Sequence, residues 1–167
     1  AKLEQLNLKP EDIDVLVLSH LHIDHAGNLN LFSGTKAGQE VIVHQKELKE
    51  ALYLTHLGPN RNWGAYVRDD FVVDGISYRP VSEDFELARG VEIITLEGDA
   101  PGILGLVLHL EHAGTIIYPS DAIKTKANFG PPPVPAGVVY DSLGFLRSVE
   151  KVRNLQRKYE ATILFPH

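Results

Sequence analysis

The 167-residue sequence contains no cysteine. The protein therefore has no disulfide framework, and it has no thiolate to offer as a metal ligand. Any metal ion has to be held by nitrogen and oxygen donors. This draws attention to the eight histidines and to the carboxylates.

Long apolar runs and clustered basic residues are also absent. No apolar run approaches the ~20 residues that a membrane-spanning helix needs. The 16 Lys and Arg residues are outnumbered by 22 Asp and Glu residues, which opposes binding to a phosphate backbone. The polar stretch after Lys2 is unlike the apolar core of a secretion signal. We expect a soluble, cytoplasmic protein that binds neither nucleic acid nor membrane.

Methionine is missing as well. The chain begins at Ala1 and ends at His167, directly after the apolar segment 162–165. A domain seldom ends on the last residue of a core strand, because terminal segments are normally tied down or capped. We expect residues 1–167 to be a single domain that lacks its amino-terminal strands and a carboxy-terminal tail.

The most informative motif is HLHIDH, which begins at His20 and directly follows the apolar stretch 15–18. Imidazole nitrogens and carboxylate oxygens are the usual ligands of zinc. Alternate residues of an extended segment point to the same side, so His20 and His22 can hold one ion. Asp24 and His25 follow where the chain turns, so they can face a second ion. The spacing indicates a dinuclear metal site.

Apolar strand-like runs alternate with amphipathic segments, which predicts an α/β fold. Helices are expected over 45–57 and from a cap at Asp141 or Ser142 through Leu155. The proline-rich segment 128–140 is expected to be a fixed loop. Strands are expected over 13–18, 41–43, 91–96, 104–110, 115–118 and 162–165, with a hairpin over 72–78 that turns at an Asp-Gly pair.

Asp99, Asp121 and His167 each lie just beyond the end of an expected strand. In α/β sheets, functional groups gather beyond the carboxyl ends of strands, so each can deliver a ligand to the loop that starts at His20. A carboxylate such as Asp121 can bridge two metal ions, whereas an imidazole cannot. For Asp99 alone, a turn-forming role after Gly98 is an equal alternative.

Six short motifs together point to a family: SHLHIDHAG at 19–27, GDAPG at 98–102, SDA at 120–122, NFGPP at 128–132, YDSLGF at 140–145 and FPH at 165–167. The chain resembles the metallo-β-lactamase fold hydrolases over essentially its whole length, and most closely their N-acyl-homoserine lactonase branch. The resemblance implies an αββα sandwich whose first strands would precede Ala1.

The resemblance also implies a ligand set for two metal ions. Transferred to this sequence, it gives one ion to His20, His22 and Asp99, the other to Asp24, His25 and His167, and the bridging position to Asp121.

Two positions depart from the family's pattern. Asp99 stands where family members usually have histidine. A carboxylate can ligate zinc, but it makes the site harder and more anionic, which favours iron or manganese, or leaves only one metal tightly held. Lys124 stands three residues after Asp121, where lactonases of this branch place a tyrosine near the substrate carbonyl. An ammonium can also stabilise an oxyanion, from a longer and more flexible stem.

The expected reaction is hydrolysis of an ester, in particular the opening of a lactone such as an N-acyl-homoserine lactone, which is quorum quenching. Two divalent ions, zinc first and iron or manganese otherwise, lower the pKa of water from 15.7 toward ~7. Asp24 would pass a proton to the leaving alkoxide, and Lys124 would stabilise the oxyanion. Phe129, Val134 and Phe145 would line an acyl pocket or simply anchor their loop. A homodimer is compatible with this picture.

Two alternatives from other classes stay open. One is another hydrolase of the same fold, acting on a thioester, a phosphodiester or a sulfate ester. The other is a non-hydrolytic protein, either a mononuclear iron oxygenase or a metal-binding module whose activity has lapsed because of Asp99 and Lys124. Metal analysis combined with oxygen uptake separates the oxygenase from the hydrolases.

Overall fold

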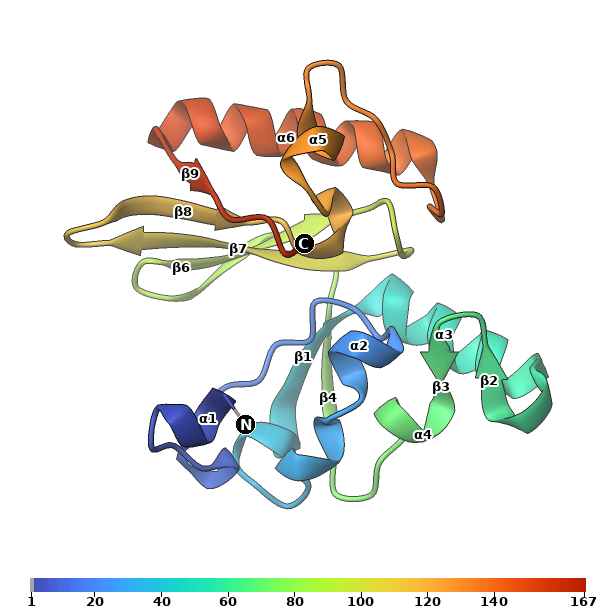
Figure 1. Ribbon diagram of the computed structural model, residues 1–167. Helices are drawn as coiled ribbons and strands as arrows, with labels where there is room; N and C mark the ends of the chain where they lie inside the picture. The colour runs from blue at the N-terminus through green and yellow to red at the C-terminus, as the bar shows by residue number, and fades with distance from the viewer. Residues whose placement is uncertain (1) are drawn as a thin grey trace. The chain divides into compact units, whose positions relative to one another are not determined.

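The computed structural model describes residues 2–167, and these form two units, one up to Val81 and one over Ser82–His167, each with its own apolar core. Both units combine strands with helices (Figure 1), so the α/β fold class predicted from the sequence is confirmed. Within residues 2–167, no helix has both the length and the apolar character needed to cross a bilayer.

The first unit contains a short parallel sheet. Strand β1 (Val41–His44) pairs in parallel with β4 (Tyr78–Val81). On its other side, β1 pairs with residues 16–18, through the N–H of Leu18 bonded to the carbonyl of Ile42 at 2.9 Å. All four residues of β1 are buried, as expected for a parallel strand with neighbours on both sides. The strand expected over 13–18 is therefore reduced to a single bridge at its end.

Helix α3 (Gln45–Leu57) follows β1 directly and occupies the range predicted from its periodicity. Its amino terminus is capped by His44, whose Nδ1 accepts a hydrogen bond from the N–H of Lys46 at 3.1 Å. The remaining elements of this unit are short: α1 (Lys2–Gln5), η1 (Pro10–Asp12), α2 (Ile23–Ala26), η2 (Leu29–Phe32), η3 (Ala37–Glu40), η4 (Pro59–Arg61), β2 (Asn62–Trp63), β3 (Tyr66–Val67) and α4 (Arg68–Phe71).

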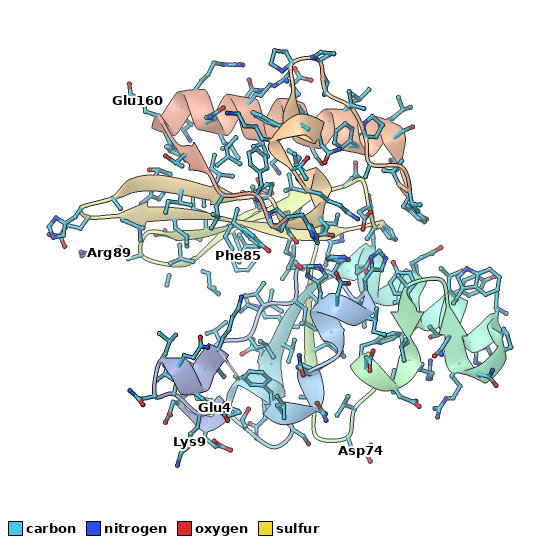
Figure 2. The ribbon with its side chains drawn as sticks, viewed as in Figure 1. Glu4, Lys9, Asp74, Phe85, Arg89 and Glu160 are labelled. Atoms are coloured by element: carbon cyan, nitrogen blue, oxygen red, sulfur yellow. The ribbon has the colours of Figure 1, made fainter. Side chains whose placement is uncertain are left out.

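The hairpin expected over 72–78 does not form. The chain does turn there, with Gly75 at φ +77° and the N–H of Ile76 bonded to the carbonyl of Val73 at 3.2 Å. Asp74 lies exposed at this turn (Figure 2). The chain before the turn is the helix α4, and the strand after it, β4, pairs in parallel with β1. The turn chemistry was right, but pairing with a strand distant in sequence replaced the local hairpin.

The second unit is a five-stranded sheet in the order β5-β6-β7-β8-β9. Its first four strands are antiparallel neighbours, whereas β9 lies parallel to β8. The expected strands are present, although the last one is shorter than the predicted 162–165. The bounds are β5 (Phe85–Ala88), β6 (Val91–Leu96), β7 (Ile103–Leu110), β8 (Gly114–Tyr118) and β9 (Thr162–Ile163).

Helix α6 (Ser142–Tyr159) runs along one face of this sheet (Figure 1). Its apolar stripe includes the buried Phe145, Val149 and Val152, which belong to the core of the unit. Asp141 caps it as predicted, because its carboxylate accepts a hydrogen bond from the N–H of Leu143 at 3.0 Å. The short helix α5 (Lys126–Phe129) takes the first residues of the expected loop, and residues 130–141 form no helix or strand.

Strand direction decides at which end of the sheet the carboxyl end of each strand lies. β8 and β9 are parallel, and β6 points the same way because both β6 and β8 are antiparallel to β7. The carboxyl ends of these three strands therefore meet at one edge. The segments that follow them carry the predicted site residues of this unit.

Replacing Ile117 tests the packing of the sheet. Ile117 is fully buried in β8 and pairs with Val107 on β7 and Ile163 on β9. Ile117→Ala is expected to lower the free energy of unfolding by about 3 kcal/mol, because it removes buried methyl groups and leaves a cavity. Leu110→Ala, at a β7 position that is 43% exposed, is expected to cost under about 1 kcal/mol. Urea denaturation measures both, and equal losses would contradict this packing.

Candidate metal centre

The HLHIDH motif begins in extended chain and ends in the one-turn helix α2. His22 has φ −65° and ψ 153° and stands at the amino-terminal cap of α2. Its carbonyl accepts hydrogen bonds from the N–H groups of His25 and Ala26, both at 2.9 Å. His20 thus lies on the extended part, whereas Asp24 and His25 lie on the helical turn. This is the change of direction that the sequence predicted after the strand.

The geometry of the first two histidines suits a shared ion. Nε2 of His20 lies 3.1 Å from Nδ1 of His22, so these two alternate residues do point to the same side. Two ligand nitrogens on one tetrahedral zinc ion, each bonded at about 2.0 to 2.1 Å, stand about 3.3 Å apart. The side chains of this segment therefore fit the demands of a divalent metal ion.

Ser19 contacts two rings of the same cluster. Its hydroxyl lies 3.2 Å from Nδ1 of His20 and 3.2 Å from Nδ1 of His25. These two rings also pack together, with centroids 4.0 Å apart. A hydrogen bond at Nδ1 fixes the orientation of an imidazole and leaves Nε2 as its ligand atom. Asp24 is the more open member of the group: its side chain is 59% exposed and lies 3.5 Å from Nε2 of His25.

In the second unit, a strained backbone position sets the direction of Asp121. After β8, Ser120 adopts a left-handed conformation with φ +48° and is fully buried. This conformation is costly for a residue with a Cβ atom, and such residues concentrate at functional sites. It turns the chain into the 3₁₀ helix η5 (Ser120–Ile123), in which Asp121 is 5% exposed.

His167 joins Asp121 at the same edge of the sheet. Because β9 runs parallel to β8, the segment after β9 continues alongside the segment after β8: the N–H of Leu164 bonds to the carbonyl of Ile117 at 2.9 Å. Further along, the N–H of His167 bonds to the carbonyl of Lys124 at 3.1 Å. Nε2 of His167 then lies 3.4 Å from the Oδ2 atom of Asp121.

Asp99 reaches this edge from the end of β6. The preceding Gly98 has φ +144°, a conformation that favours glycine, and a Cβ atom there would stand 3.4 Å from the backbone of Phe145. The glycine therefore allows the turn, whereas α6 lies at an ordinary van der Waals distance that a Cβ atom would also tolerate. One carboxylate oxygen of Asp99 lies 2.9 Å from Nζ of Lys124, which also lies 3.5 Å from Asp121.

The structure thus gathers the predicted residues into two groups, one in each unit. The first unit holds His20, His22, Asp24 and His25, and the second holds Asp99, Asp121, Lys124 and His167.

The three residues proposed for an acyl pocket have different surroundings. Phe145 borders a cavity of about 10 Å³ beside Asp99, Asp121 and Lys124, which has room for about one water molecule. Phe129 packs instead against the ring of Phe165, with centroids 5.8 Å apart, and Val134 is 52% exposed. Of the two roles weighed for Phe129, these contacts favour anchoring of the loop.

Comparison with known sequences finds relatives over the whole chain. A sequence model of the metallo-beta-lactamase superfamily matches residues 1–167. The N-acyl homoserine lactonase AiiB of Rhizobium rhizogenes is 33% identical over 99% of this chain and 60% of its own. An N-acyl homoserine lactonase of Bacillus cereus is 28% identical over the same shares. The chain thus spans about 60% of the length of these curated relatives.

Solved structures agree. The crystal structure of a quorum-quenching N-acyl homoserine lactone lactonase matches with a TM-score of 0.79 and 26% identity, over 99% of this chain and 62% of that one. An N-acyl homoserine lactone hydrolase with N-hexanoyl-L-homoserine bound at its catalytic metal center gives the same TM-score and identity, covering 60% of its chain. These similarities confirm the predicted fold family.

Sequence analysis missed Glu47, a fully buried carboxylate on α3. One of its oxygens accepts a hydrogen bond from the N–H of Leu21 at 2.9 Å, and the other accepts from the hydroxyl of Tyr66 at 3.2 Å. The ring of Tyr66 packs on His22, with centroids 4.9 Å apart. Glu47 therefore holds Leu21, which lies between His20 and His22, and supports His22 through Tyr66. Its position in line with the buried Ala51 and Thr55 was the available signal.

Substitution of Glu47 tests this support. Glu47→Ala removes both acceptors and is expected to weaken zinc binding by about 10- to 100-fold, the usual cost of losing a group that orients metal ligands. Glu47→Gln keeps an acceptor oxygen for the N–H of Leu21 and should retain most of the affinity. Glu50→Ala, on the same helix, is the matched control. Competition with a chelator measures the affinity, and wild-type binding by Glu47→Ala would show that Glu47 has no part in positioning the ligands.

Proposed function

Because the chain belongs to the metallo-β-lactamase superfamily, we propose that it acts as a metal-dependent hydrolase that opens lactones, with N-acyl-homoserine lactones as the first candidate substrates. The single observation that carries the proposal is the approach of two ring nitrogens, on His20 and His22, to the separation that one divalent ion requires. The similarity to the N-acyl homoserine lactonases supports the choice of substrate class.

The proposed ligand set is the one that family membership suggests, and it draws on both groups of residues. Two divalent ions, zinc in the first instance, would be held by His20, His22, Asp24, His25, Asp99, Asp121 and His167. The chemistry of this set supports it, since three imidazoles of the first unit lie together and a buried carboxylate of the second unit has an imidazole beside it. No thiolate is needed, in line with a cysteine-free chain.

When bound, such ions supply Lewis acidity, which lowers the pKa of water toward ~7 and polarises a carbonyl group. The remaining steps fall to the protein's own side chains. Hydrolysis adds water to the carbonyl carbon of the lactone, breaks the ring carbon–oxygen bond and leaves an alkoxide that needs a proton. Asp24 is the proposed proton carrier: its open carboxylate would take the proton released when water adds to the carbonyl and pass it to the alkoxide. Lys124 remains the proposed partner of the developing oxyanion.

Removal of single ligands tests the metal site. In the full-length protein, His22→Ala and Asp121→Ala are each expected to lower the zinc content by at least one ion per chain. Lactonase activity should fall more than about a hundredfold in the same variants. His56→Ala, an exposed histidine on α3, should change neither quantity. Elemental analysis and turnover of an acyl-homoserine lactone provide the two measurements. Unchanged zinc in both ligand variants would contradict the site, and iron with oxygen uptake would contradict hydrolysis.

The role of Asp24 is tested with two leaving groups. A proton donor matters for a poor leaving group such as a lactone alkoxide, and much less for an acidic phenolate. Asp24→Asn is therefore expected to lower kcat on a lactone by about 10²- to 10⁴-fold, and to lower kcat on an activated aryl ester by far less. The ratio of the two losses is independent of any shared loss of metal. Equal losses on both substrates would leave Asp24 as a ligand without a proton-transfer role.

A further inference from the structure

The two positions at which the chain departs from the family pattern, Asp99 and Lys124, are in contact. We propose that the ammonium of Lys124 acts as a resident cation that competes with the divalent ion taken by Asp99, so that the protein loads its two ions in separate steps, one tight and one weak. This inference rests on the proposed function. It adds a specific role for Lys124 in metal binding.

The contact is a close, three-membered charge cluster. Nζ of Lys124 lies 2.9 Å from Asp99 and 3.5 Å from Asp121. The side chains of the two carboxylates are 9% and 4% exposed, and that of the lysine is 29% exposed. The ammonium therefore offsets the mutual repulsion of two carboxylates that are largely shielded from water, where charges interact more strongly than at the surface.

The surroundings keep the lysine charged. Its amine has carboxylate oxygens of Asp99 and Asp121 at 2.9 Å and 3.5 Å, and opposite charges at such distances favour the charged form of an amine. At neutral pH the amine is thus an ammonium with no acceptor capacity. It cannot serve as a metal ligand, and a divalent cation that approaches the same carboxylate is repelled by it.

The backbone of Lys124 is held in a position from which the side chain reaches Asp99. It follows η5 directly, and its carbonyl accepts the N–H of His167 at 3.1 Å. The cavity of about 10 Å³ beside it has room for about one water molecule, so a displaced ammonium has to move toward solvent, to which the side chain is 29% exposed. An ion that takes Asp99 as a ligand has to displace the ammonium from its 2.9 Å contact. The cost of that displacement falls mainly on this ion, because the contact of Lys124 with Asp121 is the longer of the two, at 3.5 Å.

The test measures stepwise zinc binding by calorimetry and equilibrium dialysis in the full-length protein. Wild type should show one tight and one weak step. Lys124→Met, which keeps the stem and removes the charge, should tighten the weak step at least tenfold and change the tight step far less. Lys124→Arg should keep the weak step weak. Asp99→Asn should weaken it further, and Lys126→Met, an exposed lysine two residues away, should match wild type.

Two equal steps in wild type, or an unchanged weak step in Lys124→Met, would overturn the inference. An unchanged weak step in Asp99→Asn would do the same, because Asp99 would then not be a ligand. Circular dichroism checks that each variant is folded, and Lys124→Gln replaces the methionine variant if that one is not. Complete absence of zinc binding in wild type would instead refute the proposed function, so the two failures are distinguishable.

Discussion

Strand direction is the constraint that brings the predicted site residues of the second unit to one end of its sheet. β9 is short, yet its parallel alignment with β8 carries the last residues of the chain alongside η5. An antiparallel β9 would send His167 to the opposite edge of the sheet. β6 points the same way as β8 and β9 because two antiparallel pairings separate it from β8. Backbone pairing therefore brings a carboxylate, a lysine and an imidazole from distant parts of the sequence to the same end of the sheet.

Charge balance is the second constraint. Asp99 and Asp121 approach each other in a largely buried place, and Lys124 is the cation that the chain itself supplies there. In the first unit, the buried Glu47 has the complementary role, since it satisfies a backbone N–H of the histidine segment. The predicted site residues of the two units are thus held differently: Glu47 acts through hydrogen bonds in the first, and Lys124 acts through an ion pair in the second.

Local sequence signals predicted those features of the structure that depend on residues close together in the sequence. The extended alternation that puts His20 beside His22, the turn at Asp24, and the range of α3 all follow from periodicity. The expected strand ends also located the positions of Asp99, Asp121 and His167 at one edge. The hairpin over 72–78 failed because β4 pairs with β1, more than thirty residues away, and local turn chemistry carries no information about such a partner.

Side-chain partners across the fold were beyond the reach of the sequence. Nothing in the spacing of Asp99 and Lys124 indicates a 2.9 Å contact, because that distance depends on how Gly98 and η5 turn. Glu47 was overlooked for a related reason: a charged residue on a helix is usually solvated, and its burial follows from the backbone that it meets. Family resemblance located both departures, and only the structure shows that they form one pair.

The left-handed conformation of Ser120 limits which substitutions at this position can stabilise the protein. A glycine there would relieve an unfavourable backbone conformation, but it would also widen the range of conformations open to the unfolded chain and to the turn itself. Relief of strain would raise the free energy of unfolding, and the added freedom of the unfolded chain would lower it. A turn with more freedom would also hold the Asp121 carboxylate less firmly in its direction. Stability alone therefore does not decide the residue at position 120, and engineering for stability is best directed away from it.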